Sequence, residues 1–62
     1  MIKKDYQTKL QISLKKAQSL ITTIEKMIDE EQHCLKIGQQ VNAVLGLLRG
    51  ANATLLQNHL ET

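Results

Sequence analysis

The sequence contains no proline, tryptophan or phenylalanine, one tyrosine and only three glycines among its 62 residues. Because few positions break a helix or favour a tight turn, the composition indicates helices rather than strands. Without tryptophan or phenylalanine, the core must be built mainly from aliphatic side chains. A chain of this length buries only about 60% of its unfolded surface on folding. We therefore expect oligomerisation to supply further buried surface.

Cysteine is equally scarce: Cys34 is the only one, which excludes a disulfide within the chain. No apolar run approaches the roughly 18 residues of a membrane span. None follows Met1-Ile2-Lys3-Lys4, as one would in a signal peptide. A free cysteine without a secretion signal is typical of the reducing cytoplasm, where we expect the protein to act without a membrane partner.

The net charge is only +2, too small to identify a nucleic-acid partner, but the charges are unevenly distributed. Residues 1–16 contain five lysines and one acidic residue, whereas residues 25–31 contain four acidic residues and one lysine. The first helix should therefore have a basic start and an acidic end. A solvated surface explains this pattern as readily as a charged partner does.

Two segments carry apolar residues at alternating spacings of four and three, the pattern of a helix with an apolar stripe. Asp5 or Thr8 is predicted to cap the first helix at its N-terminus. We expect both stripes to form core. Additional apolar residues widen them, so each helix should face more than one neighbour. The stripes consist of Leu10, Leu14, Ala17, Ile21, Ile24 and Ile28 in the first segment, and Ile37, Val41, Val44, Leu48, Ala51 and Leu55 in the second.

The two stripes are out of register with each other, which favours two helices over one continuous helix. Continued past Ile28, the first stripe would use Glu31 and Gly38, whereas the second begins at Ile37 after a polar run over 29–32. We therefore predict one all-α domain over 1–62, with helices over about 5–29 and 34–60 and a break at about 29–34. The helices should form an antiparallel hairpin that dimerises into a four-helix bundle, with a dimer of dimers as the larger alternative. Three glycines interrupt the second stripe, and close approach of another backbone is our interpretation of them.

Cys34 and His59 are the main candidates for metal binding or thiol chemistry, with His33 and Asn58 as weaker ones. Cys34 lies near the start of the second helix, where the helix dipole favours a thiolate. His59 lies 25 residues later, roughly 37 Å away along a straight helix. An antiparallel dimer would bring Cys34 of one chain beside His59 of the other. A lone cysteine is, however, more often a small buried hydrophobic residue.

The second segment resembles the second helix of the copper-sensing operon repressor family (CsoR), which has nickel/cobalt-sensing and formaldehyde-sensing relatives. The matching positions run from Cys34 through Gln40-Val41 and Ala43-Val44 to Asn58-His59-Leu60. The resemblance extends over residues of about 10–60 and includes the first helix. It implies an all-helical homodimer, usually paired into a flat tetramer, that represses a metal or stress operon and binds double-stranded operator DNA without a helix-turn-helix.

The resemblance also assigns residues to roles. It implies that Cys34 and His59 are metal ligands, with a second cysteine at position 63 in copper sensors; the sequence ends at Thr62, without the family's short third helix. Lys15-Lys16 matches the family's basic pair, but Ser19-Leu20 replaces the Gly-Gln that follows it. We expect phosphate contacts from Lys9, Lys15, Lys16 and Arg49.

Three hypotheses follow for function. The first is a repressor that releases operator DNA when Cu(I), the expected inducer, binds at an inter-subunit site formed by Cys34 and His59. The second keeps this fold but has Cys34 sense reactive sulfur or an aldehyde by covalent modification. The third is a helical oligomerisation module without DNA binding. An enzyme is not expected, because the sequence has no phosphate-binding loop, paired catalytic carboxylates or Ser/His/Asp arrangement.

Overall fold

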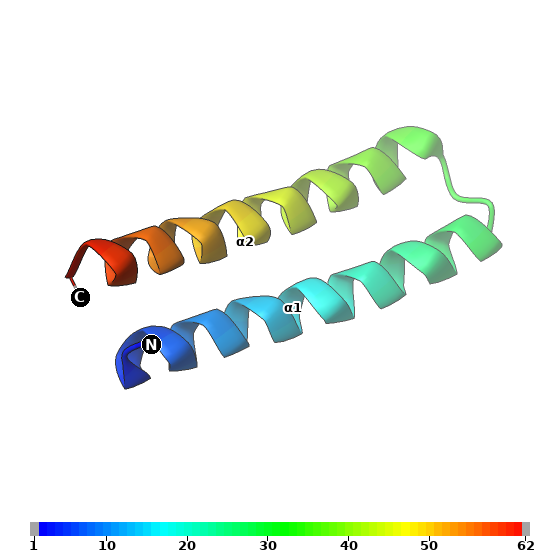
Figure 1. Ribbon diagram of the computed structural model, residues 1–62. Coiled ribbons are helices and arrows are strands. Elements are labelled where there is room, and N and C mark those ends of the chain that lie inside the picture. The colour runs from blue at the N-terminus through cyan, green and yellow to red at the C-terminus, as the bar shows by residue number, and fades with distance from the viewer. Residues whose placement is uncertain (1, 62) are drawn as a thin grey trace.

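The computed structural model describes residues 2–61, which form two helices, α1 (Lys4–Asp29) and α2 (Cys34–Glu61). The helices run antiparallel, with the chain ends together at one end of the hairpin and the connecting turn at the other (Figure 1). The hairpin is elongated, with principal extents of 46 × 15 × 11 Å. The predicted all-α helical hairpin is confirmed. Neither helix of the described part is long and apolar enough to cross a membrane.

The two helices meet along a contact that we call the hairpin seam. Its residues are buried or half-buried and recur at spacings of three and four, because these spacings return to the same side of a helix. Alanines at the centre of the contact alternate with larger side chains. The seam consists of Tyr6, Leu10, Ser13, Ala17, Leu20, Ile24 and Met27 in α1, and Ile37, Gln40, Val44, Leu47, Ala51, Thr54 and Asn58 in α2.

The prediction that each whole apolar stripe forms core is wrong for the single chain. Alternate members of each stripe, such as Leu10 and Ala17, lie in the seam. The other members are between 41% and 56% exposed. The second heptad position of the seam is that of Ser13, on the opposite side of Leu10, so the position of Leu14 lies beside the contact between the two helices. The exposed members are Leu14, Ile21, Ile28, Val41, Leu48 and Leu55.

The turn between the helices is fixed by backbone hydrogen bonds. The N–H of Glu31 donates to the carbonyl of Ile28 and that of Gln32 to the carbonyl of Met27, both at 3.0 Å, which is a Schellman motif. Glu31 has a φ of 56°, in the left-handed region that favours glycine. Nδ1 of His33 accepts a hydrogen bond from the N–H of Leu35 at 3.1 Å, so this side chain caps the start of α2.

The start of α1 differs from the prediction that Asp5 or Thr8 is its N-cap. The N-cap is Lys3, which has extended backbone angles and makes no side-chain capping bond. Asp5 lies inside the first turn, where its negative charge interacts favourably with the helix dipole. Thr8 donates its hydroxyl to the carbonyl of Lys4 at 3.1 Å. The helix starts earlier because the backbone N–H of Lys3, the residue immediately before α1, donates a hydrogen bond to α2 that is described below.

Candidate functional site

One side of the hairpin carries a row of exposed aliphatic side chains from both helices. Each follows a seam residue by four positions, which places it about 40° around the helix at about 100° per residue. Because the helices are antiparallel, this offset leads to the same side of the hairpin in α1 and α2. We call this surface the apolar face; it consists of Leu14, Ile21, Ile28, Val41, Leu48 and Leu55, with Leu45 one turn beyond Val41.

Cys34 and His59 lie at the two ends of the apolar face. Cys34 precedes Val41 by seven residues and shares its heptad position, whereas His59 follows Leu55 by four. Both side chains are exposed, and Cys34 is a free thiol. They lie near opposite ends of α2, roughly 37 Å apart by helix rise, so one chain does not bring them together.

Within the described residues 2–61, no three or more His, Cys, Asp or Glu side chains form a group that could hold a metal ion. The thiol of Cys34 and the imidazole of His59 suit a soft ion with few ligands. These donors fit such an ion only if the thiol comes from one chain and the imidazole from another. A metal centre built on them therefore needs a second copy.

The two weaker ligand candidates have structural roles in the hairpin. His33 uses Nδ1 to cap α2. Asn58 is only 6% exposed, and its Oδ1 accepts a hydrogen bond from the backbone N–H of Lys3 at 2.8 Å. Because a buried amide must be paired to offset its desolvation, this bond accounts for a polar residue in the seam.

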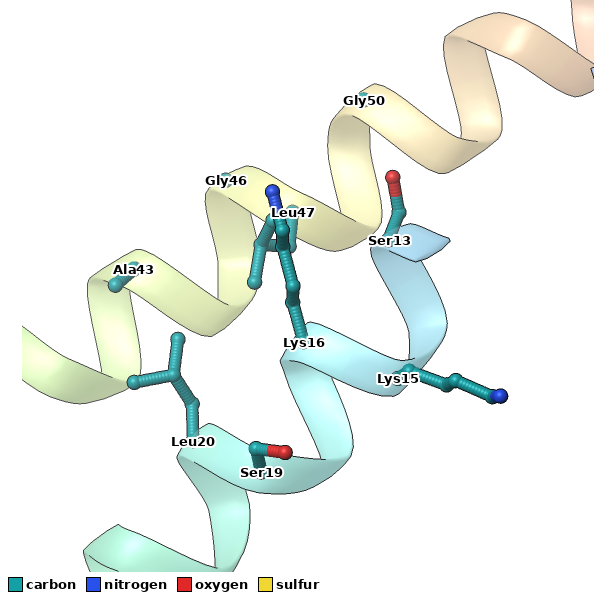
Figure 2. A pocket seen from close by; sticks show the side chains of 9 residues that line it. All are labelled: Ser13, Lys15, Lys16, Ser19, Leu20, Ala43, Gly46, Leu47 and Gly50. Atoms are coloured by element: carbon teal, nitrogen blue, oxygen red, sulfur yellow. The ribbon is translucent and has the colours of Figure 1, made fainter. Parts of the chain in front are cut away.

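The four residues predicted to contact DNA lie outside the hairpin seam, on the side opposite the apolar face or on the outer sides of the helices. Lys9 and Lys16 each immediately precede a buried seam residue. Going back one residue is a rotation of about 100° around the helix axis, in the direction opposite to the rotation that leads to the apolar face. Arg49 precedes buried Ala51 by two residues, a rotation of about 200°, which places it on the outer side of α2, away from α1. Lys15 points away from α2 (Figure 2). All four are exposed, and we call the surface formed by Lys9, Lys15, Lys16 and Arg49 the basic face.

A groove of about 770 Å³ lies between the helices on the basic face. Ala43, Gly46 and Gly50 line it from α2, and the side chain of Lys16 extends across it from α1 (Figure 2). A Cβ atom at Gly46 or Gly50 would meet nothing within 4 Å. The same holds at Gly38. No other backbone of the same chain therefore requires these glycines, and the close approach that we expected is not made within the hairpin.

The open end of the hairpin is held by a set of polar contacts that we call the terminal clasp, formed by Lys3, Tyr6, Asn58 and Glu61. Besides the bond from Lys3 to Asn58, the hydroxyl of Tyr6 donates to Oε2 of Glu61. Nζ of Lys3 lies 3.7 Å from the same carboxylate oxygen. The hydrogen bond to Glu61 raises the pKa of Tyr6, and partial desolvation and the charges of Glu61 and Asp5 add to this.

Sequence reasoning does not single out two residues that the structure places near the candidate sites. Lys36 is exposed and immediately precedes the seam residue Ile37, as Lys9 precedes Leu10, so its heptad position is a signal for the basic face. Tyr6 has no comparable signal. Its partner Glu61 is 55 residues away in sequence.

Comparison with known proteins gives a consistent set of relatives. A family model described as metal-sensitive transcriptional repressor matches residues 6–62. The chain is 37% identical over 49 residues to the copper-sensing transcriptional repressor CsoR of Mycobacterium ulcerans, which covers 79% of this chain and 42% of that protein. It is 35% identical over 49 residues to the CsoR of Mycobacterium tuberculosis, covering 79% and 41%. The aligned region thus spans less than half the length of these relatives. No solved structure matches.

Proposed function

The chain belongs to the metal-sensitive transcriptional repressor family, and on that premise we propose that it acts in a cytoplasmic repressor that releases operator DNA on binding Cu(I). The family is one of transcriptional repressors, which confirms the prediction that the chain is not an enzyme. The observation that carries the proposal is the placement of Cys34 and His59 at the two ends of one apolar face. Lys9 and Lys16 lie on the other side of the hairpin.

A second copy of the chain is the proposed occupant of the apolar face. Aliphatic side chains exposed in a continuous row mark an interaction surface. The midpoint of α2 between Cys34 and His59 falls between Gly46 and Leu47, and Leu45 and Leu48 are equidistant from it. A two-fold axis at this midpoint pairs Cys34 with His59 of the second copy and Leu45 with Leu48 of the second copy. One symmetric contact therefore buries the leucines and assembles both ligand pairs.

The chemistry of the ligand pair supports Cu(I) as the inducer. Cu(I) is a soft ion that accepts a thiolate and an imidazole at low coordination number. Cys34 of one copy and His59 of the other would hold it. Joining these residues fixes the start of one α2 against the end of the other. If this arrangement of the two subunits has the lower affinity for DNA, binding of Cu(I) shifts the population of dimers toward the form that releases DNA.

The basic face supports double-stranded DNA as the partner. Lys9 and Lys16 are exposed on the side opposite the proposed dimer contact, so dimerisation leaves them accessible, and Arg49 is exposed on the outer side of α2. Lysine and arginine contacts to phosphates do not depend on sequence, and they make binding strongly dependent on salt. Pairing of two dimers into a tetramer would extend this surface.

The test is fluorescence anisotropy of labelled DNA from the protein's own promoter, with Cu(I) added without oxygen. We expect binding that weakens as salt rises and release near one Cu(I) per subunit. Cys34→Ala should still bind DNA but not respond, and Thr22→Val, an exposed change on α1 away from the ligands, should respond normally. A Cys34→Ala protein that still releases DNA with Cu(I) contradicts the proposal.

The exposure of the Cys34 thiol favours one second candidate, a covalent sensor of reactive sulfur or aldehyde. The same assay separates it from the first: DNA is then released by a sulfane-sulfur donor or formaldehyde but not by Cu(I). A chain that binds no duplex DNA even at low salt is an oligomerisation module.

A further inference from the structure

We propose that Tyr6 is a positioning residue that connects the proposed metal ligand His59 to the proposed DNA contact Lys9. This inference rests on the proposed function, because it assigns a route by which ligand binding at one surface reaches the other. Tyr6 is half-buried in the hairpin seam and makes one polar contact toward each surface.

The first contact joins Tyr6 to the turn of α2 that carries His59. The hydroxyl of Tyr6 donates to the carboxylate of Glu61, two residues after His59. Asn58, immediately before His59, accepts the N–H of Lys3 at 2.8 Å. The last turn of α2 is therefore bound to the start of α1 on both sides of His59. A displacement of that turn must move the start of α1 or break these bonds.

The second contact joins Tyr6 to the basic face. Nζ of Lys9 lies 5.8 Å from the centroid of the Tyr6 ring, within the range of a cation–π interaction. Lys9 is three residues after Tyr6, so the two side chains are neighbours on α1. The position of the Tyr6 ring thereby limits where the Lys9 ammonium lies.

Together the two contacts give an ordered path from the turn of α2 that carries His59, through Glu61 and Tyr6, to Lys9. When His59 is held by a ligand shared with the second copy, the last turn of α2 takes a position set by that copy's Cys34. The hydrogen bond to Glu61 transmits this change to Tyr6, and the ring transmits it to Lys9. Allosteric coupling free energies typically correspond to about 5–150-fold in affinity, and one charge-assisted hydrogen bond supports a contribution of this size.

The experiment compares Tyr6→Phe with Thr8→Val. Tyr6→Phe keeps the ring beside Lys9 and removes only the hydroxyl. Thr8→Val removes a hydroxyl from the same end of α1 whose bond goes to Lys4 within the helix. For Tyr6→Phe we expect metal-free DNA affinity within about threefold of wild type, unchanged Cu(I) stoichiometry, and a loss of DNA affinity on Cu(I) binding that is smaller by about tenfold. Thr8→Val should keep the full loss.

Two further measurements show whether the effect passes through the clasp. Amide hydrogen exchange of residues 58–61 in the metal-free protein should be faster in Tyr6→Phe and unchanged in Thr8→Val. Glu61→Leu removes the acceptor, so it should reduce the Cu(I) response as Tyr6→Phe does, and the double variant should add nothing further. Thermal unfolding of each variant identifies any change that is only a loss of fold.

A Tyr6→Phe protein that loses DNA on Cu(I) binding as fully as wild type overturns the connection while leaving the proposed function intact. Additive effects of Tyr6→Phe and Glu61→Leu also overturn it, because residues on one path must share their effect. Failure of the wild-type protein itself to release DNA with Cu(I) refutes the proposed function, and the connection with it.

Discussion

The turn that precedes Cys34 contains a conformation that a single substitution should relieve. Glu31 has a φ of 56°, and the left-handed conformation costs a residue with a Cβ about 1–2 kcal/mol. Glycine avoids this cost but loses about 0.4–1 kcal/mol through the greater freedom of the unfolded chain. Both Schellman hydrogen bonds use backbone groups and survive the change. Glu31→Gly should therefore stabilise the protein by about 0.5–1 kcal/mol.

The assay is thermal unfolding followed by circular dichroism at one fixed protein concentration, because an oligomer's melting temperature depends on concentration. For a chain of this size we expect a rise of about 4–8 °C for each kcal/mol gained. Glu30→Gly is the matched control: Glu30 has a φ of −83°, so glycine relieves nothing there and should destabilise by about 0.5–1 kcal/mol. Equal shifts in the two variants, or no gain for Glu31→Gly, would refute the reasoning.

Three further predictions concern the surfaces of the hairpin. Gly50→Ala should raise the free energy of unfolding by about 0.8 kcal/mol, measured by urea denaturation, because its Cβ meets nothing within 4 Å and alanine favours helix; no gain would mean that the groove is occupied in the folded state. Leu48→Glu should leave helicity in place at high protein concentration but shift sedimentation toward monomer, since it puts a charge at the centre of the proposed dimer contact; unchanged association would remove the apolar face as that contact. Lys16→Ala should weaken DNA binding without Cu(I) and reduce the slope of log affinity against log salt by about 1; an unchanged slope would exclude Lys16 as a phosphate contact.

The hairpin itself could be predicted, because the two apolar stripes are out of register and the polar run over 29–32 separates them. Which members of each stripe are buried within one chain could not be predicted. Leu10 and Leu14 belong to the same 4,3 pattern, yet only Leu10 is buried against α2. A spacing pattern gives the width of an apolar surface but not the number of neighbours that cover it.

The ends of the helices depended on contacts that local sequence does not reveal. Lys3 became the N-cap of α1 through a bond to Asn58, 55 residues away. Glu31 adopted a left-handed conformation without the glycine that would have predicted it. The terminal clasp could not be predicted for the same reason, since Tyr6 and Glu61 are adjacent only once the hairpin has formed.

Part of the candidate site could be predicted from the sequence. Cys34 and His59 were identified by residue type and by resemblance, and helix rise alone showed that one chain could not join them. Their location on the apolar face required the burial of the neighbouring residues. The division between this face and the basic face follows from heptad positions in both helices, which can be compared only when the antiparallel pairing is fixed.

The central claim is that one copy's Cys34 and the other copy's His59 form a single site, and mixed dimers test it most directly. Cys34→Ala and His59→Ala are each titrated with Cu(I) against a chelator, alone and after being unfolded and refolded together. The account predicts that neither variant binds tightly alone. The mixture should recover about a quarter of the wild-type sites, because half of its dimers are mixed and each of these has one intact pair. A mixture that binds no better than its separate components would contradict the claim.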